Sequence, residues 1–250
     1  MFWRKRRWEA ELDNAVRSAA KPALAVKPIP LIGLPYSLNP TETRFGGAPY
    51  AEAGDTWPMI GHRPYDFIAQ FNFQNIADFP NPRFGLLTVF LCWTARDAID
   101  LEKACIVRAY PQPDVGKAIL LQHPPQRDAD DYFVIPCAAE LSTVVTYPSG
   151  VNSFKRVPEI QRAVARFKDP WRAYQKSLKR IGYHEEFGTR LYGYPSWIQD
   201  NTLDDDKLEF VLQVGSDPLP NLEIGDAGCI FVAASKTDPP RFETDPCQCF

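Results

Sequence analysis

Residues 65–73 read YDFIAQFNF, and this stretch sets the pattern for the fold. Aromatic side chains and one alanine alternate with a second set that mixes Ile68 with polar residues, Gln70 among them. A period of two residues is typical of a β-strand, because successive side chains of a strand point to opposite faces. The stretch therefore predicts a strand with one buried face and one mixed face, and Gln70 is either a ligand contact or a structural residue.

The same strand pattern occurs a second time, 143 residues further along the chain. The segment FIAQF at 67–71 matches FVLQV at 210–214, and GLLTV at 85–89 matches GCIFV at 228–232. A two-copy match at this spacing is typical of an ancient duplication, whereas a solenoid stacks many short repeats. We therefore expect two similar β-rich halves related by pseudo-symmetry.

Loop residues repeat as well, at an offset of 146 residues. The matched residues are Arg44, Gly47 and Pro49 in the first half, and Arg190, Gly193 and Pro195 in the second. The glycines suit tight turns that need a positive φ angle. Gln213 takes the place of Gln70, and two equivalent glutamines indicate a shared structural task. We expect each side-chain amide to hydrogen bond to backbone groups of a neighbouring loop, because buried amides need partners.

These patterns predict an α+β fold with two similar, mainly antiparallel β-rich halves related by internal duplication and a long interrupted helical segment between them. The expected parts are an N-terminal helix (9–20) with a proline-rich arm over 1–40, the first half over 41–150, a basic helical segment over 151–188 and the second half over 189–250. Residues 41–250 are expected to form one compact unit. Besides the repeated strands, strands are expected over 86–93, 103–109, 116–121, 131–136 and 142–147.

Residues 157–181 are the longest helix candidate. Pro158 suits a first helical turn, Gly182 suits the end, and Pro170 predicts a break within the segment or two helices. Basic side chains dominate this segment, and four of them are candidates for binding a partner: Arg162, Arg166, Arg172 and Lys176. The segment is either a solvated helix face or a surface for an acidic partner.

An acidic run lies before the second repeated strand and consists of Asp204, Asp205 and Asp206. Its spacing is not that of a calcium-binding EF-hand loop, which alternates its ligands around a glycine. We therefore expect a solvated turn or, alternatively, a face that meets a basic partner.

Two tryptophans and two arginines are candidates for a groove between the halves. Trp57 and Trp197 each precede a repeated strand, and we expect them to cover the core of their half or to anchor a ligand in a cleft. Arg44 and Arg190 are expected to tie loops through carbonyl or carboxylate groups, or to line the same cleft.

Composition argues against several function classes. The formal net charge is −3, which does not favour nucleic acid or membrane as a partner of the whole chain, and no segment approaches the ~20 apolar residues of a membrane span. The first residues lack the apolar part of a secretory signal, so we expect a cytoplasmic protein. The six cysteines and three histidines show no spacing typical of a metal site, and no G-x-S-x-G or H-E-x-x-H motif occurs. We expect no catalytic residue, no metal and no cofactor.

Taken together, the motifs resemble those of the DUF1963 (YwqG-like) proteins, a bacterial family named for its unknown function. The resembling segments are FGGAPY at 45–50, WP at 57–58, FIAQFN at 67–72, GYP at 193–195, LQVGSD at 212–217, GDAG at 225–228 and CQC at 247–249. They extend from about residue 40 to the end of the sequence. The resemblance implies an α+β fold rich in antiparallel strands, and it brings no catalytic residue that can be transferred.

Some members of that family resemble immunity proteins encoded beside secreted toxins. The resemblance therefore implies a non-catalytic protein-binding protein, namely a cytoplasmic immunity protein that neutralises a cognate secreted bacterial toxin. An enzyme or a small-ligand-binding protein that uses the cleft between the two halves is the alternative.

Overall fold

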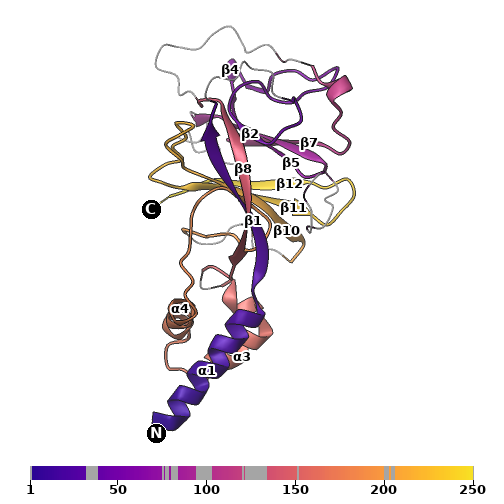
Figure 1. Cartoon of the computed structure of the whole chain (residues 1–250). Helices are drawn as coiled ribbons and strands as arrows, with labels where there is room; N and C mark the ends of the chain where they lie inside the picture. The colour runs from indigo at the N-terminus through magenta and orange to yellow at the C-terminus, as the bar shows by residue number, and fades with distance from the viewer. Residues whose placement is uncertain are drawn as a thin grey trace.

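The chain forms a curled antiparallel sheet with a group of helices at one end (Figure 1). The computed structural model describes residues 2–31, 39–74, 76, 79, 84–93, 103–119, 121, 134–150, 152–199, 203 and 206–249. The described helices are α1 (Phe2–Ser18), α3 (Pro158–Val164) and α4 (Pro170–Arg180), with 3-10 turns at Val115–Lys117 and Phe154–Arg156. The described strands are β1 (Lys21–Pro30), β2 (Arg44–Phe45), β3 (Met59–Ile60), β4 (Arg63–Pro64), β5 (Asp66–Asn72), β6 (Leu86–Leu91), β7 (Cys105–Tyr110), β8 (Cys137–Thr146), β9 (Arg190–Leu191), β10 (Leu208–Gly215), β11 (Cys229–Ser235) and β12 (Phe242–Gln248).

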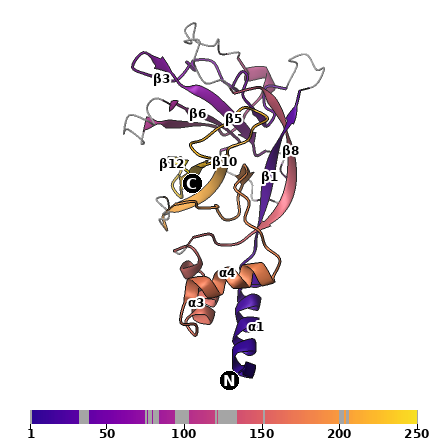
Figure 2. The ribbon, with the colours of Figure 1, turned by 90° about the vertical axis from the view of Figure 1, so that its left-hand side faces the viewer.

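Ten of these strands form one sheet in the order β12-β11-β10-β9-β1-β8-β2-β5-β6-β7, while β3 and β4 form a separate hairpin. The sheet curls until its two outer strands meet (Figure 2). There the Cys105 thiol on β7 hydrogen bonds with the Thr244 side chain on β12, and burial raises the pKa of that thiol to about 12. The nearly closed sheet encloses one core to which both halves contribute, for example through Phe71 and Leu212. The predicted α+β class with mainly antiparallel strands is confirmed.

The strand order is symmetric about the central pair β1 and β8. On each side follow a two-residue strand (β2 or β9), a long strand (β5 or β10) and two further strands. Equivalent residues keep the same register, because Arg44 pairs with Gln70 and Arg190 pairs with Gln213. Each long strand also carries a register shift two residues before its glutamine. The segments that match in sequence are therefore alike in topology and register.

β1 corrects the expectation of a proline-rich arm outside the β-rich halves, because it is a central strand of the sheet. The Val26 N–H donates to the Thr189 carbonyl at 2.9 Å on the β9 side, and since backbone groups alternate in direction along a strand, the even-numbered residues of β1 face β9. β9 covers β1 only near Leu24 and Val26. The other even-numbered positions of β1 are Pro22, Pro28 and Pro30. Proline has no N–H to leave unpaired, which explains how the strand accommodates all three.

The interrupted helical segment expected over 157–181 consists of two helices, α3 and α4, which is one of the two outcomes predicted from Pro170. Pro170 lies in the first turn of α4, where its missing N–H costs nothing, and not in a helix interior. Asp169 caps α4 by accepting a hydrogen bond from the Arg172 N–H at 3.0 Å. The break therefore lies just before Pro170.

The helices do not lie between the two halves; they pack together at one end of the sheet (Figures 1 and 2). α1 begins at Phe2, earlier than expected, and its Leu12 and Val16 share a core with Ile160 and Tyr174. We call residues 2–18 and 152–182 the helical module.

One of the other predicted strands is wrong, and another lies partly outside the described residues. The segment 116–121 overlaps the 3-10 turn Val115–Lys117 and forms no strand where it is described. In the segment 131–136, residues 131–133 lie outside the described residues and 134–136 form no strand. The strand expected over 142–147 is the second half of β8, which starts earlier, at Cys137.

Candidate functional site

Gln70 ties β5 to the loops that precede and follow β2. Its Oε1 accepts a hydrogen bond from the Tyr50 N–H, and its Nε2 donates to the carbonyls of Pro40 and Glu42, all at 2.7 Å. The side chain is 0% exposed, because the mixed face of β5 is covered by these loops. The predicted hydrogen bonds to the backbone are confirmed.

Gln213 performs the equivalent task in the second half. Its Oε1 accepts from the Ser196 N–H at 2.9 Å, and its Nε2 donates to the Gly188 carbonyl at 2.8 Å. Ser196 and Gly188 are related to Tyr50 and Glu42 by the same offset of 146 residues that relates the two arginines. Gln213 is also 0% exposed, so both glutamines are structural residues whose polar atoms are satisfied within the protein.

Arg44 and Arg190 are buried loop ties, 7% and 5% exposed. Arg44 Nη2 donates to the Ala48 carbonyl, while Arg190 Nη2 donates to the Ser196 hydroxyl and, at 3.2 Å, to Gln213 Oε1. Burial lowers the pKa of Arg44 to about 10 and lowers that of Arg190 as well. Both guanidinium groups hold their loops against the sheet through these hydrogen bonds.

Trp57 and Trp197 cover apolar clusters of their own halves. The Trp57 ring lies 5.9 Å from that of Phe90, and its Nε1 donates to the Tyr65 carbonyl at 2.8 Å. The Trp197 ring lies 4.5 Å from that of Phe231. Of the four groove candidates, Arg44 and Trp197 line two different pockets and neither Trp57 nor Arg190 lines either of them. Neither of these two pockets therefore brings the four candidates together.

The glycine turns of the two halves have the same backbone conformation. Gly46 and Gly47 have φ angles of 56° and 76°, and Tyr192 and Gly193 have φ angles of 62° and 73°. At Gly193 a Cβ atom would lie 2.4 Å from the Thr146 hydroxyl oxygen, so only glycine fits there. Tyr192 is a non-glycine residue in the left-handed region, which is uncommon and often marks a functional position.

Each of these turns forms a wall of a pocket. In the first half, residues 46–49 line a pocket of about 480 Å³ together with Val115 and Ile119. In the second half, residues 192–195 line a pocket of about 860 Å³ that also reaches the helical module through Arg156. Both volumes are in the range of small-molecule sites, roughly 300–1,000 Å³. The larger pocket lies where the second half meets the helical module, and Phe79 of the first half also lines it.

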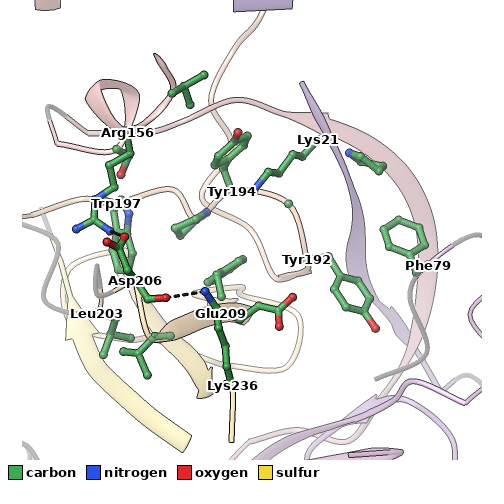
Figure 3. Close-up of a pocket in the computed structure, with 17 residues that line it drawn as sticks. Lys21, Phe79, Arg156, Tyr192, Tyr194, Trp197, Leu203, Asp206, Glu209 and Lys236 are labelled. Carbon is green, nitrogen blue, oxygen red and sulfur yellow. Dashed lines mark hydrogen bonds and ion pairs between the residues drawn. The ribbon is translucent and has the colours of Figure 1, made fainter. Parts of the chain in front are cut away.

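Aromatic rings form much of the larger pocket (Figure 3). The Tyr192 ring stacks on Phe79 with centroids 5.1 Å apart, and Lys21 Nζ lies 4.3 Å from the centroid of the Tyr194 ring. Trp197 contributes a further wall. Rings with a cation nearby provide stacking and cation–π contacts for a ligand.

At the same pocket, Asp206 binds both Arg156 and Lys236 (Figure 3). Arg156 Nη1 lies 3.1 Å from Asp206 Oδ1, and Lys236 Nζ donates to the Asp206 carbonyl at 2.6 Å. Asp206, a predicted partner-binding residue, thus joins the helical module to the loop before β10. Asp204 and Asp205 lie outside the described residues.

The helical module concentrates positive charge. It carries 14 of the 28 Lys and Arg residues of the chain but only 5 of the 31 Asp and Glu residues. Several of its arginines are neutralised: Arg180 by Asp13 at 2.6 Å and Arg166 by Glu11. Arg162 pairs with Glu159 at 3.2 Å.

Other cations of the module are exposed and form no ion pair with a described residue, among them Lys168, Arg172 and Lys176. They line one shallow hollow of about 140 Å³ whose wall also includes the acidic Glu9 and Asp169 and the apolar Phe167. Of the four predicted partner-binding cations, Arg172 and Lys176 are therefore the two available for a partner, whereas Arg162 and Arg166 are engaged.

Within the described ranges, no three His, Cys, Asp or Glu side chains lie close enough together to hold a metal ion. Among the helices described above, none combines the length and apolarity needed to cross a bilayer.

Sequence reasoning missed several residues that the structure brings together. Lys21 and Tyr194 are distant in sequence and meet only through the β1–β9 pairing. Gln248 is 1% exposed, and its Oε1 accepts from the N–H groups of Ile198 and Gln199 at 3.1 and 3.2 Å. The CQC segment could have indicated these hydrogen bonds of Gln248. Unlike Gln70 and Gln213, however, Gln248 has no matching motif in the other half.

The fold and its paired loops define an α+β protein built on one nearly closed antiparallel sheet. The chain belongs to the family described as "Domain of unknown function (DUF1963)", whose model matches residues 43–241. The predicted resemblance is confirmed. Comparison with curated proteins found no match.

Proposed function

We propose that this protein is a non-catalytic binding protein, a cytoplasmic immunity protein that neutralises a cognate secreted bacterial toxin through the helical module. The family resemblance supplies the class. The observation that carries the binding surface is a group of exposed cations, Lys168, Arg172 and Lys176, which form no ion pair with a described residue and line one hollow.

The charge arrangement supports an acidic partner. Arg172 and Lys176 lie one turn apart on α4, and like charges at this spacing destabilise a helix by about 0.2–0.5 kcal/mol. The hollow has four cationic and two acidic lining residues, so it keeps a net positive charge. A partner carboxylate seated there would relieve the repulsion and place its apolar stem against Phe167. Rim charges of this kind mainly raise the association rate and select the partner.

A pull-down from the native host, followed by measurement of the affinity for the captured protein, tests the proposal. We expect the double variant Arg172→Glu with Lys176→Glu to weaken binding at least tenfold and to reduce its salt dependence. Lys117→Glu is the matched control, because Lys117 is an exposed cation on the 3-10 turn of the β-rich part and not in the helical module.

Two outcomes contradict the proposal. Unchanged affinity in the double variant places the interface elsewhere. Binding of DNA or RNA that weakens steeply with salt and is lost in the same variant assigns the module to nucleic acid instead.

We also propose that the two halves arose by internal duplication. The support is that residues matched in sequence share register, the strand irregularity and the glutamine hydrogen bonds. An ancestral single half would then have paired through the strand equivalent to β1 and β8.

A second candidate function is small-ligand binding in the larger pocket, favoured by its aromatic lining at a junction between two parts of the chain. A thermal-shift screen with metabolites tests it. A bound ligand adds RT ln(1 + [L]/Kd) to the free energy of unfolding and should therefore raise the Tm of the wild type. Tyr194→Ala should abolish that rise. An equal rise in the variant excludes this pocket.

A further inference from the structure

Among the described residues, none pairs with the outer edge of β8 over its second half. β2 pairs only with the first two residues of β8, whereas β1 pairs with β8 over its whole length. Because the Val26 N–H faces β9, the odd-numbered residues of β1 bond to β8, and their partners in β8 are even-numbered. Leu141, Thr143 and Val145 therefore direct their N–H and C=O groups outward. No described residue pairs with them on that side.

The open edge of β1 and the equivalent edge of β8 differ in sequence. Arg190 of β9 pairs with Ala25 of β1, and the equivalent Arg44 of β2 pairs with Ala138 of β8. Ala25 and Ala138 are therefore equivalent positions of the two central strands. Pro28 and Pro30 of β1 then correspond to Leu141 and Thr143 of β8. Prolines block an open edge because they offer no donor to an incoming strand. The edge of β1 is blocked in this way, and the equivalent edge of β8 keeps its donors.

The same edge exposes apolar side chains that continue a buried face. Leu141 and Val145 are 41% and 52% exposed. Leu141 lies opposite Val26, which is 2% exposed and part of the main core. Residues directly opposite one another in a sheet share a face. The core face thus continues to β8, where its side chains are exposed. A further strand beside β8 would place its own side chains next to them on the same face.

We propose that β8 pairs antiparallel with β8 of a second copy, which joins two sheets in a two-fold homodimer. A register centred on Thr143 places Leu141 of each copy opposite Val145 of the other and Thr143 opposite itself. The three outward-facing residues then exchange about six hydrogen bonds.

Self-pairing fits this edge for a chemical reason. The segment reads Leu-Ser-Thr-Val-Val over residues 141–145, so its outward-facing positions carry apolar, threonine and apolar residues in either direction. The cross-strand pairs formed are of the kind that stabilises sheets. In the same register Glu140 lies opposite Thr146, so no like charges meet. The inference does not depend on the proposed immunity function, because it concerns a different surface.

Sedimentation analysis of the full chain over the micromolar range tests the inference. We expect the wild type to form a concentration-dependent dimer. Thr143→Pro should raise its dissociation constant at least tenfold, since it places proline where the equivalent β1 position already has Pro30. Circular dichroism checks that the variant is folded.

A charge-swap pair tests the register. Thr143→Lys alone and Thr143→Glu alone should each be monomeric, because identical charges meet at the two-fold axis, and their mixture should form a heterodimer. Met59→Lys is the matched control: Met59 is exposed and apolar but lies on the separate hairpin, so dimerisation should persist. A wild type that stays monomeric throughout the range overturns the inference, and so does a dimer that survives both Thr143→Pro and Thr143→Lys.

Discussion

Replacing either of the paired glutamines by methionine should remove a structural tie of similar strength from each half. Methionine nearly preserves the length of the side chain and has no strong hydrogen-bonding group. In Gln70→Met the buried Tyr50 N–H loses its acceptor, and two loop carbonyls lose their donor. An orphaned buried group costs about 1–3 kcal/mol, and water partly satisfies the carbonyls of the partly exposed loop. We expect a loss of about 3 kcal/mol.

The same reasoning applies to Gln213→Met, in which the Ser196 N–H and the Gly188 carbonyl lose their partner. A loss of about 3 kcal/mol is a large part of a typical stability of about 5–15 kcal/mol. Urea denaturation followed by circular dichroism measures it. Gln175→Met on α4 is the control, since Gln175 is exposed and should change stability by less than about 0.5 kcal/mol. A loss below about 1 kcal/mol in both buried variants would refute the argument.

Two further predictions concern single contacts. Gly193→Ala should cost more than about 2 kcal/mol by urea denaturation, because its φ is +73° and a Cβ would lie 2.4 Å from the Thr146 hydroxyl oxygen. Gly61→Ala, with φ +60° and nothing within 4 Å, should cost only about 1 kcal/mol, and equal costs would contradict the steric argument. Burial alone would raise the pKa of Asp13, but hydrogen bonds, chiefly from Arg180, outweigh it and lower that pKa below its ordinary 3.8. The stabilisation is therefore present above pH 3.8 and lost as pH falls through the lowered value. Asp13→Asn should lower the Tm by about 2–4 °C at pH 7 and by much less in strong acid; an equal difference at both pH values would contradict this.

Local pattern was enough to predict the repeated strands, their buried glutamines and the glycine turns. A strand shows itself in a period of two residues, and a duplication shows itself as the same residues at a fixed offset. Both signals are carried by neighbouring residues, so no knowledge of the rest of the chain is needed. The paired glutamines show this best, because Gln213 indicated the role of Gln70 before any contact was known.

Pairings between distant segments were decided only by the tertiary structure. Pro22, Pro28 and Pro30 disfavour a central strand when read locally, and β1 accommodates them because β9 is too short to need their missing donors. The sequence does not indicate against which element the charged segment 157–181 packs. In the structure it packs against α1, because their apolar faces share one core. The sequence by itself determined the two halves, whereas burial and strand pairing determined the strand order, the position of the helical module and the open edge of β8.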